Sequence, residues 1–243
     1  MLSYETLKNK AREFLAATGL RVEEFQELLP AFESAYEKCY PSHQTLEGKP
    51  RRRRAGGGAK GLLTSSADRL LFILIYEKTN PLQAMHGLQF GLSQPQTNYW
   101  IHQLLPVLQQ GLADLGMRPE REAGGVAASP LALEGTSDLA IDGSERRRQR
   151  PQDDEVQKAH YSGKKKTHTD KNLLLVNEDT GKVAYLSPTG RGKTHDKKLA
   201  DEAGINYPCN ATLDKDTGFQ GYEPEGVITR QPKKTERQAV EYR

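Results

Sequence analysis

The sequence predicts an all-α N-terminal part followed by a mixed α/β part. Apolar residues recur at helical spacing from about residue 4 to residue 115, whereas short apolar runs of strand length dominate after residue 138. In the second part these runs follow in the order strand, strand, strand, helix, strand, strand. A helical domain followed by a domain with a mixed sheet is therefore expected.

Composition limits the function less than the distribution of charge does. The chain has 243 residues and a net charge of +3, so it is only mildly basic. Its basic residues nevertheless gather in four clusters: Arg51–Arg54, Arg146–Arg150, Lys164–Lys166 and Lys233–Lys234. Such clusters favour an anionic polymer as partner, while solvated surface charge also explains any one of them.

The sequence also indicates a compartment. Its two cysteines, Cys39 and Cys209, are far apart and offer neither a disulfide framework nor paired metal-ligand spacing. The N-terminus lacks the apolar core of a signal peptide, and no apolar run reaches the length of a membrane span. We expect a cytoplasmic protein with no membrane partner.

The first helical segment covers residues 1–47, where Gly19 and Pro30 divide the pattern into two or three short helices. Residues 48–60, "GKPRRRRAGGGAK", then form a charged, glycine-rich linker that cannot bury a core. Its arginines fit DNA phosphates or a minor groove, and they equally fit a loop without contacts.

Residues 61–117 have the pattern of a helix-turn-helix domain. Ser65 or Ser66 caps one helix, Gly91 ends the next, and Ser93 with Pro95 begins the third. Amide side chains at the start of the third helix suit base edges of double-stranded DNA. The candidate DNA-binding residues here are Gln94, Gln96, Thr97 and Asn98. The aromatic residues that follow, Tyr99 and Trp100, are expected in the core.

A second linker is expected at residues 118–137, before a catalytic domain at residues 138–243. Within that domain, "NLLLVNED" and "GKVAYLSP" predict a hairpin that turns at Asp179-Thr180-Gly181. The motif Gly192-Lys193-Thr194 is similar to part of a phosphate-binding P-loop. Ser187 stands where the first glycine is required, and Pro188 removes an amide donor, so we do not predict nucleotide binding.

Carboxylates near strands offer a metal site. Asp142 is predicted at the end of the strand "DLAID", where spacing alone favours a turn-forming aspartate over a metal ligand. Asp214 and Asp216 lie two apart, so both point to one side of an extended chain. Two carboxylates that hold magnesium beside lysine-rich loops would suit phosphodiester chemistry. The lysines expected to hold the DNA backbone are Lys164, Lys165, Lys166 and Lys171.

Several motifs make the chain similar to a known family. "YSGKKKTHT", "HDKKLADE" and "DTGFQGYEPEG" resemble the catalytic domain of bacterial insertion-sequence transposases of the insertion-sequence-five type, in the DDE superfamily. The N-terminal part resembles the helix-turn-helix domain that precedes it there. The resemblance implies a ribonuclease-H-like fold, Asp142 and Asp216 as catalytic metal ligands, and two Mg²⁺ or Mn²⁺ ions.

The resemblance also implies a reaction and its partners. DNA at the ends of the element would be cleaved by hydrolysis, and the freed 3′ hydroxyl would attack target DNA. Terminal repeats, target DNA and a homo-oligomer on DNA are the implied partners. His168 and His195 lie in matching motifs, but neither receives a role.

The third acidic residue of the family, a glutamate, has no convincing match. Glu236 does not fit the pattern, and Glu241 in "AVEYR" is a weak match that comes too early. We expect the catalytic domain to lack its C-terminal part, through truncation, through a frameshift, or because this is a first reading frame that is normally joined to a second. The alternative function is a catalytically inert DNA-binding fragment that regulates or inhibits transposition; a transcriptional repressor ranks third.

Overall fold

The computed structural model describes residues 1–43, 45, 49–50, 61–135 and 137–232. The chain divides into two compact units, Met1–Arg118 and Pro119–Arg243, and each is described by itself. An all-α unit followed by a mixed α/β unit confirms the predicted fold class. Arg51–Arg54, Glu236 and Glu241 lie outside the described residues.

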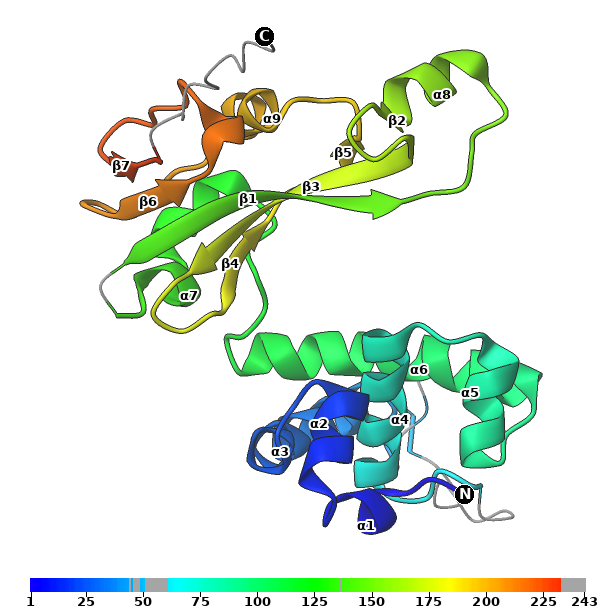
Figure 1. Cartoon of the computed structure of the whole chain (residues 1–243). Helices are drawn as coiled ribbons and strands as arrows, with labels where there is room; N and C mark the ends of the chain where they lie inside the picture. The colour runs from blue at the N-terminus through cyan, green and yellow to red at the C-terminus, as the bar shows by residue number, and fades with distance from the viewer. Residues whose placement is uncertain (44, 46–48, 51–60, 136, 233–243) are drawn as a thin grey trace, which may run out of the picture. The chain divides into compact units, whose positions relative to one another are not determined.

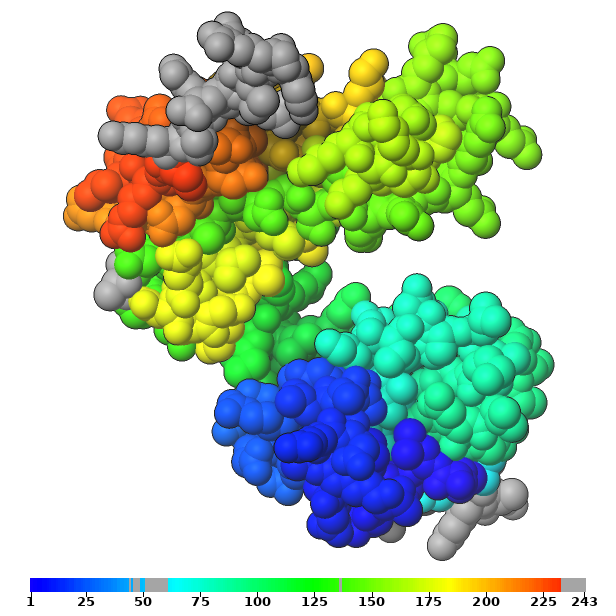
Figure 2. All heavy atoms as spheres, viewed as in Figure 1, coloured from blue at the N-terminus to red at the C-terminus, as the bar shows by residue number. Residues whose placement is uncertain are grey.

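The first unit contains six helices among its described residues. They are α1 (Tyr4–Leu7), α2 (Ala11–Thr18), α3 (Val22–Cys39), α4 (Ser66–Thr79), α5 (Gln83–Phe90) and α6 (Gln94–Asp114). α1 to α3 share one hydrophobic core with α4 to α6, so the two segments expected to form separate domains form a single unit. Figure 2 shows them in continuous contact, coloured blue and cyan.

Close packing and capping define this unit. A Cβ at Gly111 of α6 would lie 3.3 Å from the Phe32 backbone of α3, so the glycine lets the two helices approach closely. Pro30 lies inside α3 and does not end it, contrary to expectation. The buried stripe that includes Phe25 and Phe32 continues through the proline, because tertiary packing outweighs the one lost backbone hydrogen bond.

The second unit begins earlier than predicted. Residues 118–137 are not a linker, because they contain η1 (Ala123–Ala128) and α7 (Pro130–Leu133). Val126, Leu131 and Ala132 belong to the hydrophobic core of the second unit. The glycine-rich composition of residues 118–137 had predicted a linker, although the segment contributes three residues to the core.

The other elements of the second unit build a seven-stranded sheet and the helices around it. They are β1 (Asp138–Arg147), α8 (Asp154–His160), β2 (Tyr161–Ser162), β3 (Thr167–Asn177), β4 (Val183–Leu186), β5 (Gly190–Arg191), α9 (Asp196–Ala203), β6 (Thr212–Lys215), η2 (Thr217–Phe219) and β7 (Ile228–Arg230). The strand order β2-β3-β1-β6-β7 is completed by β4 and β5, which both pair with β3. The predicted hairpin is present, and Gly181 adopts φ +68° in its turn.

Two kinds of pairing meet at β1. β1 is antiparallel to β3, with Asp142 opposite Leu174, and parallel to β6, with Ile141 opposite Lys215. β1 and β3 are the long strands at the centre of the sheet in Figure 1. The crossover from β4 to the parallel strand β6 passes through α9, as the predicted order requires.

Candidate functional site

Two aspartates come together at the junction of β1 and β6. Ala140 pairs with Asp214 and Ile141 with Lys215, so the next step along the two parallel strands places Asp142 beside Asp216. Both side chains are exposed and line one hollow of about 520 Å³. The structure thus brings together the two residues that the sequence selected.

Asp142 does not end its strand, and in this the prediction was wrong. β1 continues five residues further to Arg147, because Gly143 to Arg147 keep pairing with β3. The polar letters "GSERR" had indicated a loop, yet they lie opposite the equally polar half of β3. Asp142 is therefore fixed within a strand, while Asp216 directly follows β6.

Both carboxylates are oriented by backbone amides. Asp142 Oδ1 accepts a hydrogen bond from Gly143 N at 2.7 Å, and Asp216 Oδ1 accepts one from Gly218 N at 2.8 Å. Among the described residues, no protein donor contacts either Oδ2. Carboxylate oxygens with this freedom fit hard divalent cations such as Mg²⁺, and Asp142 and Asp216 are the residues that would hold one.

Asp214 lies near the pair but is engaged elsewhere. Its carboxylate is 3.7 Å from Arg230. A side-chain hydrogen bond with Asp214 raises the pKa of Glu178. Asp214 is a neighbour of the pair.

Lys171 is buried, which corrects its predicted role in DNA binding. Its Nζ lies 2.9 Å from Asp196 and 3.2 Å from Glu145, and donates to the Thr194 carbonyl at 3.0 Å. Burial alone would raise the pKa of Glu145, but hydrogen bonds from Ser162 and Lys171 outweigh it, so this pKa is lowered. Lys171 joins β1, β3 and α9 from inside and cannot reach DNA.

Asp196, at the start of α9, is an acidic group that sequence reasoning missed. A Cβ on Gly143 would lie 2.3 Å from its Oδ1, and a Cβ on Gly218 would lie 3.2 Å from its Oδ2. The carboxylate therefore fits between the two glycines that follow Asp142 and Asp216 in the sequence. Within the described ranges, no three His, Cys, Asp or Glu side chains are arranged to hold one metal ion. The only sequence feature that could have drawn attention to Asp196 was its position in the motif "HDKK".

The backbone of the Gly192-Lys193-Thr194 segment does not form the phosphate cradle of a nucleotide-binding P-loop. The amides of Gly192, Lys193 and Thr194 all donate to backbone carbonyls within the fold. The side chain of His195 makes no capping hydrogen bond to α9. A phosphate cradle needs free amides, and these three are already used.

The three exposed lysines that precede β3 keep their predicted accessibility. Lys164, Lys165 and Lys166 occupy the turn between β2 and β3 with exposed side chains. Beside this turn, the ring of His168 contacts the ring of Tyr161 edge-on, with centroids 5.6 Å apart. The turn can therefore present three positive charges to an anionic partner.

The helix-turn-helix pattern appears as α4, α5 and α6. The Ser65 hydroxyl caps α4 by accepting from Asp68 N, and Gly91 ends α5 with φ +73°. Between α5 and α6, Gln94 donates to Gln83, which in turn donates to Asn98. Gln83 was missed by sequence reasoning, since it lies on the preceding helix.

Two expectations for the start of α6 were wrong. Thr97 is fully buried, and its hydroxyl donates to the Ser93 carbonyl at 2.9 Å, so it packs between helices and cannot contact DNA. Tyr99 is 57% exposed and not a core residue. Gln96 is exposed, but its Oε1 accepts from Ser93 N and caps the helix. Of the other two predicted amides, Gln94 is exposed and Asn98 is half-buried.

Comparison with known families gives two separate matches, one in each structural unit. Residues 62–114 match the model described as helix-turn-helix of DDE superfamily endonuclease, and residues 141–242 match the model of DDE superfamily endonuclease. Together these matches support a DDE transposase family. No curated protein and no solved structure matches the chain.

The two DDE matches agree with the structural elements. The helix-turn-helix match covers α4 to α6 and omits α1 to α3, although all six share a core. The endonuclease match begins at Ile141, directly before Asp142, and includes Asp216. The two matched regions thus correspond to a helix-turn-helix domain and to a domain similar to DDE superfamily endonucleases. Among the residues described, no helix has the length and apolarity needed to span a membrane.

Proposed function

We propose that this chain is a DDE transposase that binds the ends of a DNA element and cleaves them with divalent metal held by Asp142 and Asp216. The proposal depends chiefly on one observation. The parallel register of β1 and β6 places these two exposed carboxylates side by side, each with an oxygen free of protein donors. The proposed cofactor is Mg²⁺ or Mn²⁺, and the full site would take two ions.

The residues around Asp142 and Asp216 have different roles in the proposed reaction. Gly143 N and Gly218 N orient the two carboxylates, while Lys164 to Lys166 would contact phosphates. When bound, the metal would activate a water and stabilise charge on the phosphoryl oxygens. Water attacks the phosphorus, the bond to the 3′ oxygen breaks, and that oxygen takes up a proton. The 3′ oxygen then attacks a target phosphorus and displaces another 3′ oxygen.

DNA recognition is assigned to α5 and α6. Gln94 and Asn98 are held in one chain of amide hydrogen bonds through Gln83, which pre-orients them for base edges. We expect Gln83→Ala to reduce discrimination between element ends and unrelated duplex more than it reduces binding to unrelated duplex. The recognised repeats, the target DNA and a homo-oligomer on DNA are part of the same proposal.

Nicking of supercoiled plasmid in Mg²⁺ or Mn²⁺ tests catalysis. Asp142→Asn and Asp216→Asn should abolish nicking and the binding of Mn²⁺ followed by electron paramagnetic resonance. Asp214→Asn is the matched control, because Asp214 lies on β6 two residues before Asp216, yet is engaged by Arg230 and Glu178. Nicking that survives in Asp142→Asn would contradict the proposal.

One observation favours a second function, an inert DNA-binding fragment that regulates transposition. Asp142, Asp214 and Asp216 all line the hollow, yet no group of three His, Cys, Asp or Glu side chains that could hold one metal ion is found in the described part of the chain. The wild-type chain would then bind DNA normally but would not nick plasmid in either metal. The same plasmid assay with a binding measurement separates the two functions.

A further inference from the structure

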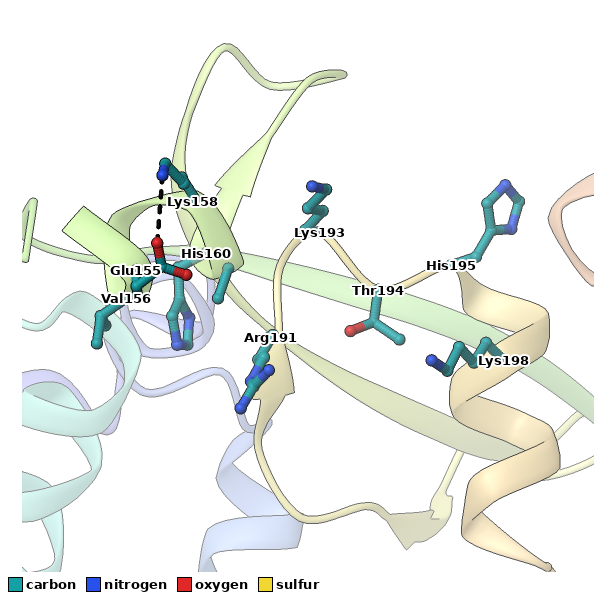
Figure 3. A pocket seen from close by; sticks show the side chains of 10 residues that line it. Glu155, Val156, Lys158, His160, Arg191, Lys193, Thr194, His195 and Lys198 are labelled. Carbon is teal, nitrogen blue, oxygen red and sulfur yellow. Dashed lines mark hydrogen bonds and ion pairs between the residues drawn. The ribbon is translucent and has the colours of Figure 1, made fainter.

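A second hollow of the endonuclease unit lies apart from the aspartate pair. It is lined by α8, by the segment from Arg191 to His195 and by the first turns of α9, and it has a volume of about 750 Å³ (Figure 3). In Figure 3 the side chains of Lys193 and Lys198 come from separate elements that border this hollow. None of the functions above uses it.

The lining is strongly basic. Four side chains carry permanent positive charge, Lys158, Arg191, Lys193 and Lys198, against the single acid Glu155. Glu155 is 3.2 Å from Lys158 and so offsets that lysine alone. Lys198 lies 3.6 Å from Glu202, whereas Arg191 and Lys193 are exposed and have no carboxylate partner among the described residues. A concave surface with uncompensated cations favours a polyanion.

Two smaller hollows each share two lining residues with this one. One of about 480 Å³ shares Lys158 and Lys193 with it and adds Tyr161 and His168. The other, of about 380 Å³, shares His195 and Lys198 and reaches Gly218. Since Gly218 N binds the Asp216 carboxylate, the series ends beside the aspartate pair. We call these three hollows the basic groove.

The two ends of the basic groove differ in chemistry. Tyr161 is 43% exposed, and its ring meets His168 edge-on, which leaves an aromatic surface at the end far from Asp216 in this series. Exposed rings stack on unpaired bases, whereas bases within a duplex are already stacked on each other. The combination of aromatic ring and cations is typical of sites for single-stranded nucleic acid.

We propose that the basic groove binds a single-stranded segment of DNA and leads it to Asp216. Arg191, Lys193 and Lys198 would contact successive phosphates, and Tyr161 would stack on an unpaired base. This inference rests on the proposed function, because it names the DNA strand that reaches the aspartate pair. It predicts that the chain prefers DNA with an unpaired strand next to the cut.

Binding of a fluorescein-labelled oligothymidine to the full chain, in EDTA and at several salt concentrations, tests the groove. Lys193→Gln should weaken binding and reduce the slope of log K against log salt by about 0.7, and Arg191→Gln/Lys193→Gln by about twice that. Lys182→Gln is the matched control, since it removes one positive charge at the β3–β4 turn, where Lys182 pairs with Glu134. It should leave the slope unchanged.

Tyr161 supplies a test that does not depend on charge. Tyr161→Ala should weaken oligothymidine binding about tenfold, and Tyr161→Phe should restore it. Equal effects of Lys193→Gln and Lys182→Gln, or wild-type binding in Tyr161→Ala, would overturn the proposal. Because EDTA removes metal, a chain that never nicks plasmid can still pass this test, so failure of cleavage and failure of the groove are distinguishable.

Discussion

The two faces of the sheet in the second unit differ in burial and in the charges that they carry. On one face, Leu139, Ile141, Leu173 and Leu175 are at most 3% exposed and pack with residues of η1, α7 and α9. On the other face, Ala140, Leu174 and Val176 are half-buried, and Asp142 is exposed. Adjacent residues of one strand thus have different surroundings.

The difference shows how a buried face can position an exposed site. Side chains alternate with a period of two, so a shift of one residue would move Leu139 and Ile141 into solvent. Burial of these residues therefore fixes the register of β1. The same register carries Asp142 to the position beside Asp216 on the open face. Four predictions test this division, from the largest expected effect to the smallest.

Lys171→Met should be the most damaging change on the covered face. It leaves Glu145 and Asp196 close together without their cation, which costs about 3–5 kcal/mol of unfolding free energy when such a pair is buried. Hydrogen exchange of the β3 amides measures this loss. Lys165→Met, on the exposed turn, is the control and should leave exchange unchanged.

Leu175 and Leu174 are neighbours that face opposite sides of the sheet. Leu175→Ala should cost on the order of 3 kcal/mol, because it opens a cavity in the core. Leu174→Ala, on the open face, should cost about half of that or less. Urea unfolding followed by circular dichroism compares them, while Trp100 fluorescence follows the N-terminal unit. Equal losses would mean that both faces are covered.

Gly143→Ala should strain the contact between β1 and α9. The new methyl group would lie 2.3 Å from Asp196 Oδ1, and Lys171 restrains that carboxylate, so a cost of about 1–3 kcal/mol is expected. Gly163→Ala meets nothing within 4 Å and serves as control. Thermal unfolding of both variants measures the difference, and plasmid nicking should fall only in Gly143→Ala.

The contributions of Glu145 and Glu178 to the stability of the fold should change with pH in opposite directions. Glu145 has a lowered pKa, so its stabilising effect is present above its ordinary pKa of 4.5 and is lost as the pH falls through the folded value. Glu178 has a raised pKa because of Asp214, so its effect favours the fold at low pH and is lost as the pH rises through the folded value.

Glu178→Gln should therefore stabilise the fold slightly at neutral pH, by a few tenths of a kcal/mol, because the pair is largely exposed and screened. Glu145→Gln should destabilise it at the same pH. Thermal unfolding of both variants between acid and neutral pH gives the signs. A stabilising Glu145→Gln would show that Lys171 does not compensate that carboxylate.

Sequence reasoning succeeded where the controlling interaction is local. The Ser65 cap, the left-handed Gly91 and the turn at Gly181 each depend on hydrogen bonds or torsions within a few residues. The choice of Asp142 with Asp216 came from the family resemblance, because spacing alone had favoured a turn for Asp142. The match to the endonuclease model includes both residues, and β1 and β6 bring them together.

Predictions from the sequence were wrong where contacts between residues distant in the chain determine the exposure of a side chain. In the sequence, Lys171 cannot be distinguished from the exposed Lys164 to Lys166. It is buried because it pairs with Glu145 of β1 and Asp196 of α9. In the sequence, Thr97 has the same polar character as its neighbour Gln96. In the structure it faces Gly87 of α5, and a Cβ on Gly87 would lie 2.4 Å from the Thr97 hydroxyl. Exposure depends on neighbours that are distant in sequence.

By itself, the sequence determined the fold class and several local caps and turns, because hydrophobic periodicity and short-range hydrogen bonds depend on residues close together in the chain. Tertiary structure alone decided the burial of Lys171, the place of Asp196 between two glycines and the basic side chains that α8, the Arg191–His195 segment and α9 bring to one hollow. Each of these results from strands and helices that meet across many residues, through pairing that no local pattern records.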